Sequence, residues 1–410
     1  MTIVLREALV SDIAIPYGGY WSSPFAKWQG KLAHLHSLRF AAAVAKRSIA
    51  ARGLSPDVFD FGVLGMTVPQ KNSFYGLPWL MGEIGAAQVG GPTINQACAT
   101  GVRILDIAQS EIAAGRAQVA LAVAADRTSN GPHIYYPAPG GPGGTGAHED
   151  WVLDNFSHDP FAQVAMIETA ENVARRHQIG TGEQNEIVSR RYQQYGDALA
   201  DDSAFLRRFM ELPFSVPDAR FEKAVGEMSG DEGVHQTSAE KLAALKPVMA
   251  GGTVTFGTQT HPADGTAAVI LTTPDRAREL SREPGIDIRI LGFGQARVDK
   301  GYMPEAPVPA AHAALADAGL AMADITAVKS HNPFIINDIV FARSFGIDVM
   351  AMNNYGCSLV WGHPQGPTGL RGVIELIEEL VLRGGGYGLF HGCAAGDTAM
   401  AVVLSVRDAR

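Results

Sequence analysis

The residues of this 410-residue chain that could do nucleophilic chemistry begin with its three cysteines, Cys98, Cys357 and Cys393. Their odd number and wide spacing disfavour a disulfide framework or a structural zinc site, so reduced thiols are expected. Cys98 stands at the start of a predicted helix, where free backbone N–H groups and the positive end of the helix dipole favour a thiolate and lower the thiol pKa. Cys98 is therefore the predicted nucleophile.

Three further residues could assist a thiol nucleophile. His363 lies in a Gly-His-Pro sequence between a predicted strand and a predicted helix, and could accept the thiol proton. Cys393 falls in a predicted exposed hairpin turn and suits general acid and base work. Asn332 directly follows a predicted strand and could hold a water where negative charge develops, although it could equally be a helix N-cap. Cys357 is predicted to be a packing residue without a catalytic role.

The elements that must position these residues occur twice, in the order helix, strand, helix, strand and closing strand. In the first copy they are predicted at residues 41–51, up to 64, 98–114, 119–125 and 264–271. In the second copy they are predicted at residues 310–318, up to 328, from 364 to 381, 387–390 and 397–404. Equivalent connections of two related halves meet around a pseudo-twofold axis, which would bring Cys98 near the C-terminal groups.

The two copies define the predicted domains. Residues 1–125, completed by 249–274, form the N-terminal core half, and residues 275–410 form the C-terminal core half. Residues 126–248 interrupt the first half and are predicted to form a lid or binding lobe over an α/β core. This insert contains a Pro/Gly-rich run at 136–144 and charged helical stretches around 168–176 and 183–195.

Composition excludes several classes of partner. The formal net charge is −9 and no run of five basic residues occurs, so no nucleic-acid partner is expected. No segment approaches about 18 consecutive apolar residues, and the N-terminus lacks the order of a signal peptide, so a cytoplasmic protein without a membrane partner is expected. Hydrophobic residues make up 46% and charged residues 18% of the chain, which is typical of a well-buried globular protein.

Taken together, four motifs resemble those of the thiolase family. Cys98 and Gly101 match its Cys-x-x-Gly turn, residues 362–364 match its Gly-His-Pro motif, Asn332 falls on the asparagine of its Asn-Glu-Ala-Phe segment, and Cys393 falls on the cysteine of its Cys-x-Gly. The resemblance implies duplicated α/β halves with mixed five-stranded sheets in layered α-β-α-β-α packing. It also implies that the insert is a loop domain for CoA binding and oligomer contacts.

The resemblance implies acyl transfer between CoA thioesters. Thiolytic cleavage of a 3-ketoacyl-CoA, or the reverse Claisen condensation, would proceed through an acyl-Cys98 intermediate, with Cys393 as acid and base. His363 and a water held by Asn332 would stabilise the enolate, and backbone N–H groups of Cys98 and Ala395 would stabilise the tetrahedral intermediate. CoA and acyl-CoA would be substrates, no metal or cofactor is expected, and a homodimer or homotetramer is implied.

The resemblance also places substrate-binding residues. Thr260 falls on a serine that contacts pantetheine, Met166 on a methionine near the acyl pocket, and His235 on a CoA-binding arginine, while Phe334 is expected beside the substrate.

Departures from the family pattern leave two alternatives open. Ala395 replaces the usual glycine of Cys-x-Gly, and Tyr355 and Cys357 add bulk before Gly-His-Pro. A catalytically impaired, thiolase-like acyl-CoA-binding protein is one alternative. A ketoacyl-synthase-like condensing enzyme, which pairs one cysteine with two histidines or with a histidine and an asparagine, is the other.

Overall fold

Two mixed β-sheets form the core of the protein. The computed structural model describes residues 12–141, 144, 146–235 and 237–408. The first sheet has the order β1 (Tyr20–Ser22), β10 (Ala263–Thr272), β5 (Val119–Arg127), β3 (Phe61–Gly65) and β4 (Thr93–Ile94), with β2 (Ala26–Lys27) paired to one end of β10. The second sheet has the order β11 (Ile286–Arg297), β14 (Thr398–Asp408), β13 (Gly385–Ala394) and β12 (Ile325–His331).

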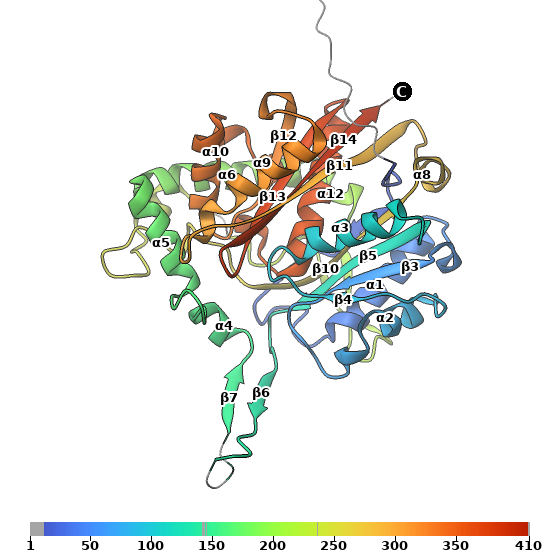
Figure 1. Cartoon of the computed structure of the whole chain (residues 1–410), viewed down its shortest axis with the longest axis horizontal. Helices are drawn as coiled ribbons and strands as arrows, with labels where there is room; N and C mark the ends of the chain where they lie inside the picture. The colour runs from blue at the N-terminus through green and yellow to red at the C-terminus, as the bar shows by residue number, and fades with distance from the viewer. Residues whose placement is uncertain (1–11, 142–143, 145, 236, 409–410) are drawn as a thin grey trace, which may run out of the picture.

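Helices cover and separate these sheets in five layers (Figure 1). The outer face of the first sheet packs on α1 (Ser37–Ala51) and α2 (Gly76–Ile84), and the second sheet packs on α9 (Pro307–Ala318). Between the sheets lie α3 (Thr100–Ala113) and α12 (Gly366–Leu382), which contact each other. Next to α9 lies α10 (Ile335–Phe345), whose Phe341 stacks on His391 of β13, and α8 (Pro274–Leu280) links the two halves. The predicted layered fold class is confirmed.

The central helix α12 is buried on all sides, including its charged residues. Arg371 forms ion pairs with Asp231 at 2.6 Å and with Glu375 at 3.0 Å, and Glu375 also pairs with Lys329 at 3.0 Å. The Tyr195 hydroxyl donates to Asp231 at 2.8 Å. Because a buried charge is stable only with partners, this network ties the inserted lobe to the helix between the sheets.

The glycine of the Cys-x-x-Gly turn is required by the contact between α3 and α12. A Cβ added at Gly101 would lie 2.5 Å from the Gly366 carbonyl oxygen and 2.8 Å from the Leu370 nitrogen. Both are backbone atoms and cannot move aside cheaply, so Gly101 permits the close approach of the two helices that carry the site.

Neither sheet has the predicted five strands in its described part, because the first has six, including the short β2, and the second has four. A fifth strand, equivalent to β4, would lie beside β12 near Asn353. Asn353 N donates to the Val328 carbonyl at 2.9 Å, but its φ of 62° turns the chain away from an extended path. Its side-chain Oδ1 accepts from Ser330 N at 2.8 Å instead. A side chain therefore replaces part of the β-ladder here.

The inserted lobe contains the predicted charged helices. They are α5 (Met166–His177) and α6 (Thr181–Ser203), which pack against the C-terminal half. The lobe also contains α4 (Leu153–Ser157), α7 (Ala239–Ala243), the pair β8 (Phe214–Pro217) and β9 (Ala224–Met228), and the hairpin of β6 (His133–Tyr136) and β7 (Ala147–Asp150). The hairpin projects from the body as an arm (Figure 1). Residues 142 and 143 of the Pro/Gly-rich run lie outside the described residues.

The remaining described elements are short. They are α11 (Ser358–Trp361) and the 3-10 turns η1 (Pro56–Val58), η2 (Ser73–Tyr75), η4 (Leu206–Arg208), η5 (Met303–Glu305), η6 (Met322–Asp324) and η7 (Val349–Ala351). Among the described helices, none is long and apolar enough to cross a membrane.

Candidate active site

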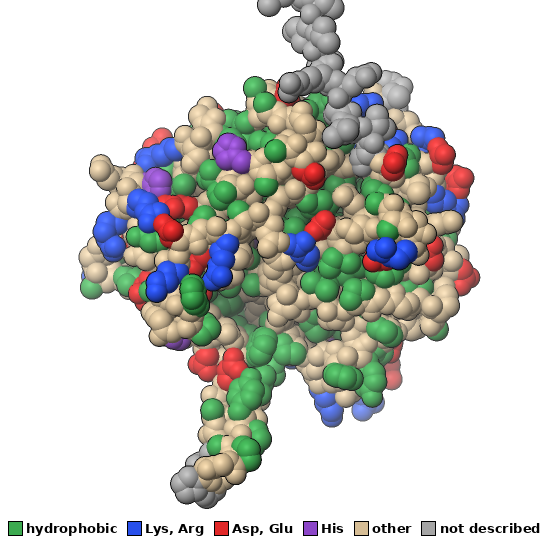
Figure 2. Space-filling model, viewed as in Figure 1, with side chains coloured by type: hydrophobic (Ala, Val, Ile, Leu, Met, Phe, Trp, Pro, Cys, Tyr) green, Lys and Arg blue, Asp and Glu red, His purple; other side chains and the backbone are tan. Residues whose placement is uncertain are grey.

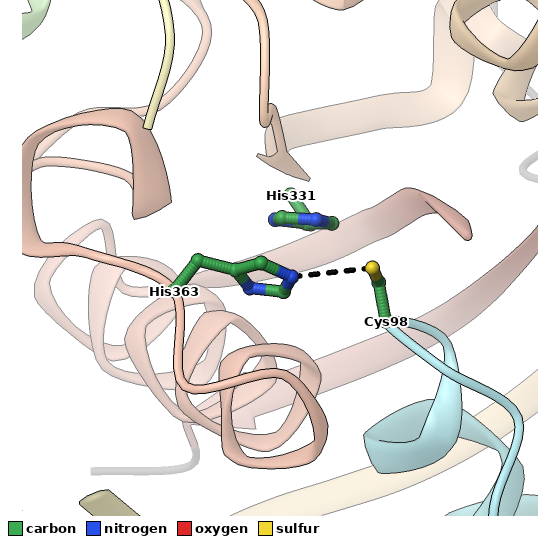
Figure 3. A group of neighbouring side chains, drawn as sticks. All are labelled: Cys98, His331 and His363. Atoms are coloured by element: carbon green, nitrogen blue, oxygen red, sulfur yellow. Dashed lines mark hydrogen bonds between the residues drawn. The ribbon is translucent and has the colours of Figure 1, made fainter. Parts of the chain in front are cut away.

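The predicted nucleophile and base lie together between the two halves. Cys98 follows Ala97, whose φ of 45° makes the sharp turn before α3. Its Sγ lies 3.2 Å from Nε2 of His363, which comes from the loop before α12 (Figure 3). Two residues separated by most of the chain are thus brought into hydrogen-bond contact.

The imidazole of His363 is fixed from two sides. Its Nδ1 lies 2.7 Å from the Thr368 hydroxyl in the first turn of α12. The ring of His331 stacks on it with a centroid distance of 4.0 Å and an interplanar angle of 25°. A tautomer in which Nδ1–H donates to Thr368 leaves the Nε2 lone pair facing the Cys98 thiol, as a general base requires.

Burial keeps this pair neutral at rest, which corrects the predicted low pKa of Cys98. Burial raises the pKa of the Cys98 thiol to about 12, although backbone N–H groups of Ala395 and Cys98 act to lower it. Burial lowers the pKa of His363 to about 3. Loss of solvation therefore outweighs the helix N-terminus, and near neutral pH the thiolate has to form by direct transfer of the proton to His363.

The backbone around Ala395 suits an oxyanion hole. The backbone N–H groups of Ala395 and Cys98 both act to lower the pKa of the Cys98 thiol, as donors directed toward its sulfur would. Ala395 is not one of the residues with positive φ, whereas Gly396 and Asp397 have φ values of 80° and 58°. The Cβ of Ala395 is therefore accommodated without strain, and the left-handed part of the turn begins one residue later.

Asn332 does not face the site, so its predicted role in holding a catalytic water is wrong. Its Nδ2 donates to Asp338 at 2.8 Å and to the Cys357 sulfur at 3.3 Å. Its Oδ1 accepts from Ser358 Oγ and Leu359 N, both at 3.1 Å. Both ends of the amide are thus occupied in the interior. It is not an N-cap either, because α10 is capped by residue 334.

His331 takes the place predicted for Asn332. Its Nδ1 lies 2.8 Å from Ser358 Oγ, and its Nε2 is buried without a hydrogen-bond partner among the described residues. One ring nitrogen each of His331 and His363 lies with the Cys98 sulfur within 4.8 Å of one another. These three are also the donor types that could hold a metal, but a metal here would occupy the predicted nucleophile.

Cys393 is near the site but is not exposed as predicted. It belongs to β13 rather than to the turn, and it is 0% exposed. Asn337 Nδ2 donates to its sulfur at 3.2 Å. Burial raises the pKa of Cys393 well above its usual value, and the negative charge of a Cys98 thiolate raises it further. Cys393 is therefore held protonated in the resting enzyme.

A cavity of about 910 Å³ opens above Cys98. Thr260, Met166 and Phe334 line it, as predicted for substrate-binding residues, whereas His235 is exposed and does not. Most of its wall is apolar, and its large apolar side chains include Trp151, Leu153, Phe156, Phe161, Met166 and Phe334. No Lys or Arg is found among the described residues that line it.

The bulky residues before the Gly-His-Pro motif do not crowd the cavity. Tyr355 stacks on Phe205, with ring centroids 4.0 Å apart. Cys357 is buried beside Asn332. Neither is among the described lining residues.

Two family models match nearly the whole described chain. The model for the thiolase N-terminal domain matches residues 21–275, and the model for the thiolase C-terminal domain matches residues 286–406. The chain belongs to the thiolase family. This thiolase is therefore an acyltransferase of the thiolase type, and the predicted family is confirmed.

The chain aligns with named relatives over most of its own length and of theirs. An acetyl-CoA acetyltransferase of Allochromatium vinosum is 27% identical over 394 residues, which are 93% of this chain and 96% of the relative. The human mitochondrial 3-ketoacyl-CoA thiolase is 29% identical over 392 residues, with the same coverage. A crystal structure of human mitochondrial 3-ketoacyl-CoA thiolase superposes with a TM-score of 0.87 at 27% identity, covering 96% of this chain and 98% of that chain.

Four residues of the site were not predicted from the sequence. They are His331, Asn337, Gln365 and Thr368. Thr368 carried a detectable signal, because a hydroxyl in the first helical turn after a histidine loop can reach back to the ring. The other three depend on contacts between segments distant in sequence.

Proposed function

We propose that this thiolase exchanges acyl groups between CoA thioesters through an acyl-Cys98 intermediate, cleaving 3-ketoacyl-CoA with free CoA or running the reverse condensation. The observation that carries the proposal is the 3.2 Å contact between Cys98 Sγ and His363 Nε2 at the floor of an apolar cavity. Relatives named for these activities support it.

In the cleavage direction, His363 takes the Cys98 proton while the sulfur attacks the 3-keto carbon. The oxygen then becomes an anion on a carbon bonded to Sγ, within reach of the Ala395 and Cys98 N–H groups that converge on the sulfur. Breaking the C2–C3 bond restores the carbonyl as an acyl thioester and expels the enolate of acetyl-CoA. Free CoA then gives its thiol proton to the Cys393 thiolate and attacks the acyl-Cys98, and the leaving Cys98 sulfur takes its proton back from His363, which restores the resting enzyme.

Cys393 would protonate the departing enolate at C2. Its raised pKa keeps it protonated at neutral pH, which suits an acid in cleavage. The protonated His363 would donate to the enolate oxygen, and His331 would donate as well in the tautomer that carries its proton on Nε2, with the Ser358 hydroxyl then turned toward Nδ1. His331 therefore replaces Asn332 and its water in this role.

The size of the cavity supports acyl groups larger than acetyl. A volume of about 910 Å³ lies near the upper end of the range that holds a drug-sized ligand, roughly 300–1,000 Å³. Leu153 is 54% and Phe161 is 61% exposed although both line this cavity, so an apolar acyl chain would cover them. The absence of Lys and Arg from the described lining suits the uncharged acyl and pantetheine groups, with the CoA phosphates outside.

A thiolysis assay over a series of 3-ketoacyl-CoAs with free CoA tests this function. We expect kcat/KM to rise from the four-carbon substrate to longer ones. Leu153→Asp should lower it for the longer substrates while that for the four-carbon substrate changes little, because the side chain meets only the chain end. Phe74→Ser, at a 95% exposed residue away from the cavity, is the matched control. No cleavage of any substrate would refute the proposed function.

One observation favours a second candidate. The grouping of Cys98 with His331 and His363 has the one-cysteine, two-histidine composition of ketoacyl-synthase-like condensing enzymes. Such an enzyme would join the acyl group on Cys98 to a carbanion formed from a malonyl thioester by loss of CO2. Incubating the acyl-enzyme with malonyl-CoA decides between them, because only the second candidate releases CO2. The impaired-enzyme alternative loses its support, since Tyr355 and Cys357 are not among the described lining residues of the cavity and Ala395, which lines it, does not need a positive φ.

We also propose a homodimer or homotetramer in a cytoplasmic, reducing environment. A two-stranded hairpin is marginally stable alone, yet the β6–β7 arm projects with Tyr135 59% and Tyr136 44% exposed. Hydrophobic side chains are visible along this arm (Figure 2). A second copy covering the arm would bury them. Three free cysteines support a reducing compartment. Sedimentation velocity of the wild type and of a variant without the arm tests the assembly.

A further inference from the structure

Gln365 occupies an unusual backbone position beside the nucleophile. Its φ of 64° and ψ of −109° are rarely adopted by residues with a side chain. The carbonyl of Gln365 accepts from Thr368 N at 3.1 Å, and the next residue, Gly366, donates its N–H to Asp126 Oδ2 at 3.0 Å. Such conformations persist only where surroundings fix them and are concentrated at functional sites, so the position calls for a functional explanation.

This backbone directs the Gln365 side chain into the site. The residue is 5% exposed and lines the cavity. Its Oε1 accepts from the Cys98 thiol at 3.3 Å, while the same sulfur lies 3.2 Å from His363 Nε2. The Gln365 side chain also acts to raise the pKa of the His363 imidazole, as an acceptor near the ring would. One amide oxygen is thus within reach of both groups between which the proton must pass.

The amide oxygen of Gln365 can accept a hydrogen bond both before and after the proton passes from Cys98 to His363. In the resting enzyme it accepts the thiol proton and keeps that proton inside the site. When His363 takes the proton, the S–H bond breaks, the Nε2–H bond forms, and the new cationic N–H can donate to the same oxygen. A hydrogen bond from a charged donor is about twice as strong as one between neutral groups, so the oxygen favours the imidazolium.

We infer that Gln365 is a positioning residue for proton transfer, whose amide oxygen holds the Cys98 proton at rest and supports the His363 imidazolium during attack. The inference rests on the proposed roles of Cys98 and His363. Gln365 would thus act with Cys98 and His363 as a third group in the proton transfer. This role would explain why the chain adopts a strained turn just before α12.

Alkylation of Cys98 by iodoacetamide, measured against pH, tests this inference without any CoA thioester. Gln365→Leu removes the acceptor at similar size, and we expect its alkylation rate near pH 7 to fall about tenfold, equivalent to about one pK unit. At high pH, where the thiol ionises without a base, the rate should return to that of the wild type. Gln365→Glu keeps an acceptor oxygen and should stay within about threefold near pH 7.

Two controls separate this role from a structural one. Gln178→Leu makes the same change at an exposed glutamine with a φ of 55°, far from the site, and should not alter the profile. Cys98→Ala gives the background from the buried Cys357 and Cys393.

A pH profile of Gln365→Leu that matches the wild type, or a loss of rate that is uniform over all pH values, would overturn the inference. If Gln365→Leu does not fold, Gln365→Glu decides, because its carboxylate should displace the high-pH limb to higher pH and an undisplaced limb contradicts the role. If the alkylation profile depends on Gln365 but no CoA thioester acylates Cys98, the proposed function is refuted and the inference on Gln365 stands.

Discussion

The contact between Thr368 and His363 gives the sharpest test of how the base is prepared. Thr368→Val keeps the shape of the side chain and removes the hydroxyl that lies 2.7 Å from Nδ1. Thr368 is 0% and His363 is 5% exposed, so water cannot replace the lost partner. Leaving a buried polar group unpaired costs about 1–3 kcal/mol.

This free-energy cost destabilises the His363 tautomer that catalysis needs. In that tautomer Nδ1 carries the proton and donates it to Thr368, so that Nε2 stays free to accept the Cys98 proton. The stack with His331 at 4.0 Å is retained and keeps the ring in place. We therefore expect acylation of Cys98 to slow roughly tenfold to hundredfold, at about 1.4 kcal/mol per factor of ten. Thr368→Ser retains the hydroxyl and should stay within about threefold of the wild type.

The assay is rapid-quench acylation from acetyl-CoA, with urea unfolding of the same variants as a check on the fold. An acylation rate for Thr368→Val within about threefold of the wild type would refute the reasoning, since the hydroxyl would then not select the tautomer.

Three further predictions concern other parts of the molecule. Cys393→Ala should still be acylated on Cys98 by acetyl-CoA but should not cleave 3-ketoacyl-CoA, as mass spectrometry and thiolysis would show; retained cleavage would contradict the role of Cys393. Burial lowers the pKa of His391 from 6.5 to about 3, so only the unfolded state takes up its proton in that range and stability falls as pH drops below about 6.5. Between pH 6.5 and pH 5 in urea unfolding, the free energy of unfolding of His391→Phe should therefore fall by about 1.6 kcal/mol less than that of the wild type, because the slope approaches about 1.4 kcal/mol per pH unit only below the unfolded pKa. An equal fall in the two proteins would contradict this prediction. Gly101→Ala should destabilise the fold by about 3 kcal/mol, because its Cβ meets backbone of α12, and an unchanged thermal midpoint would argue against that contact.

Much of the fold was predictable because each half uses strong local patterns. The apolar run at 119–125 lies within β5, and the one-sided apolar face beyond residue 364 lies on α12. Cys98 and His363 were predicted from the turns that carry them, and turns of this kind are local in sequence. The duplication then predicted their meeting.

The sequence led us to place Asn332 in the site, but the residue that faces the site is its neighbour His331. Local sequence does not reveal which of two successive side chains at the end of a strand points inward. Successive side chains at a strand end point to opposite faces, so a shift of one residue reverses which side chain enters the site. The pairing of His331 with Gly392 decides the matter, because a Cβ at Gly392 would lie 2.9 Å from the Cβ of His331. The glycine leaves room for the imidazole, and Asn332 turns into the interior.

The pKa of Cys98 was also beyond local reasoning. A helix N-terminus lowers a thiol pKa, and the flanking sequence shows that feature. The enclosure of the sulfur by the Ala395 turn and by His363 depends on the assembled halves, and its effect is the larger one. The absence of a fifth strand from the described part of the second sheet has a similar origin. The left-handed backbone of Asn353 is compensated by the bond from Ser330 N of β12 to its side chain, and this contact joins segments that are distant in sequence.

The central claim is that Cys98 carries the acyl group. Incubation with acetyl-CoA, removal of free thioester and peptide mapping by mass spectrometry measure this directly, with Cys98→Ala as the control. We expect one acetyl group on the peptide that contains Cys98, lost again when free CoA is added and absent from the variant. An unmodified Cys98, or an adduct that persists in Cys98→Ala, would contradict it.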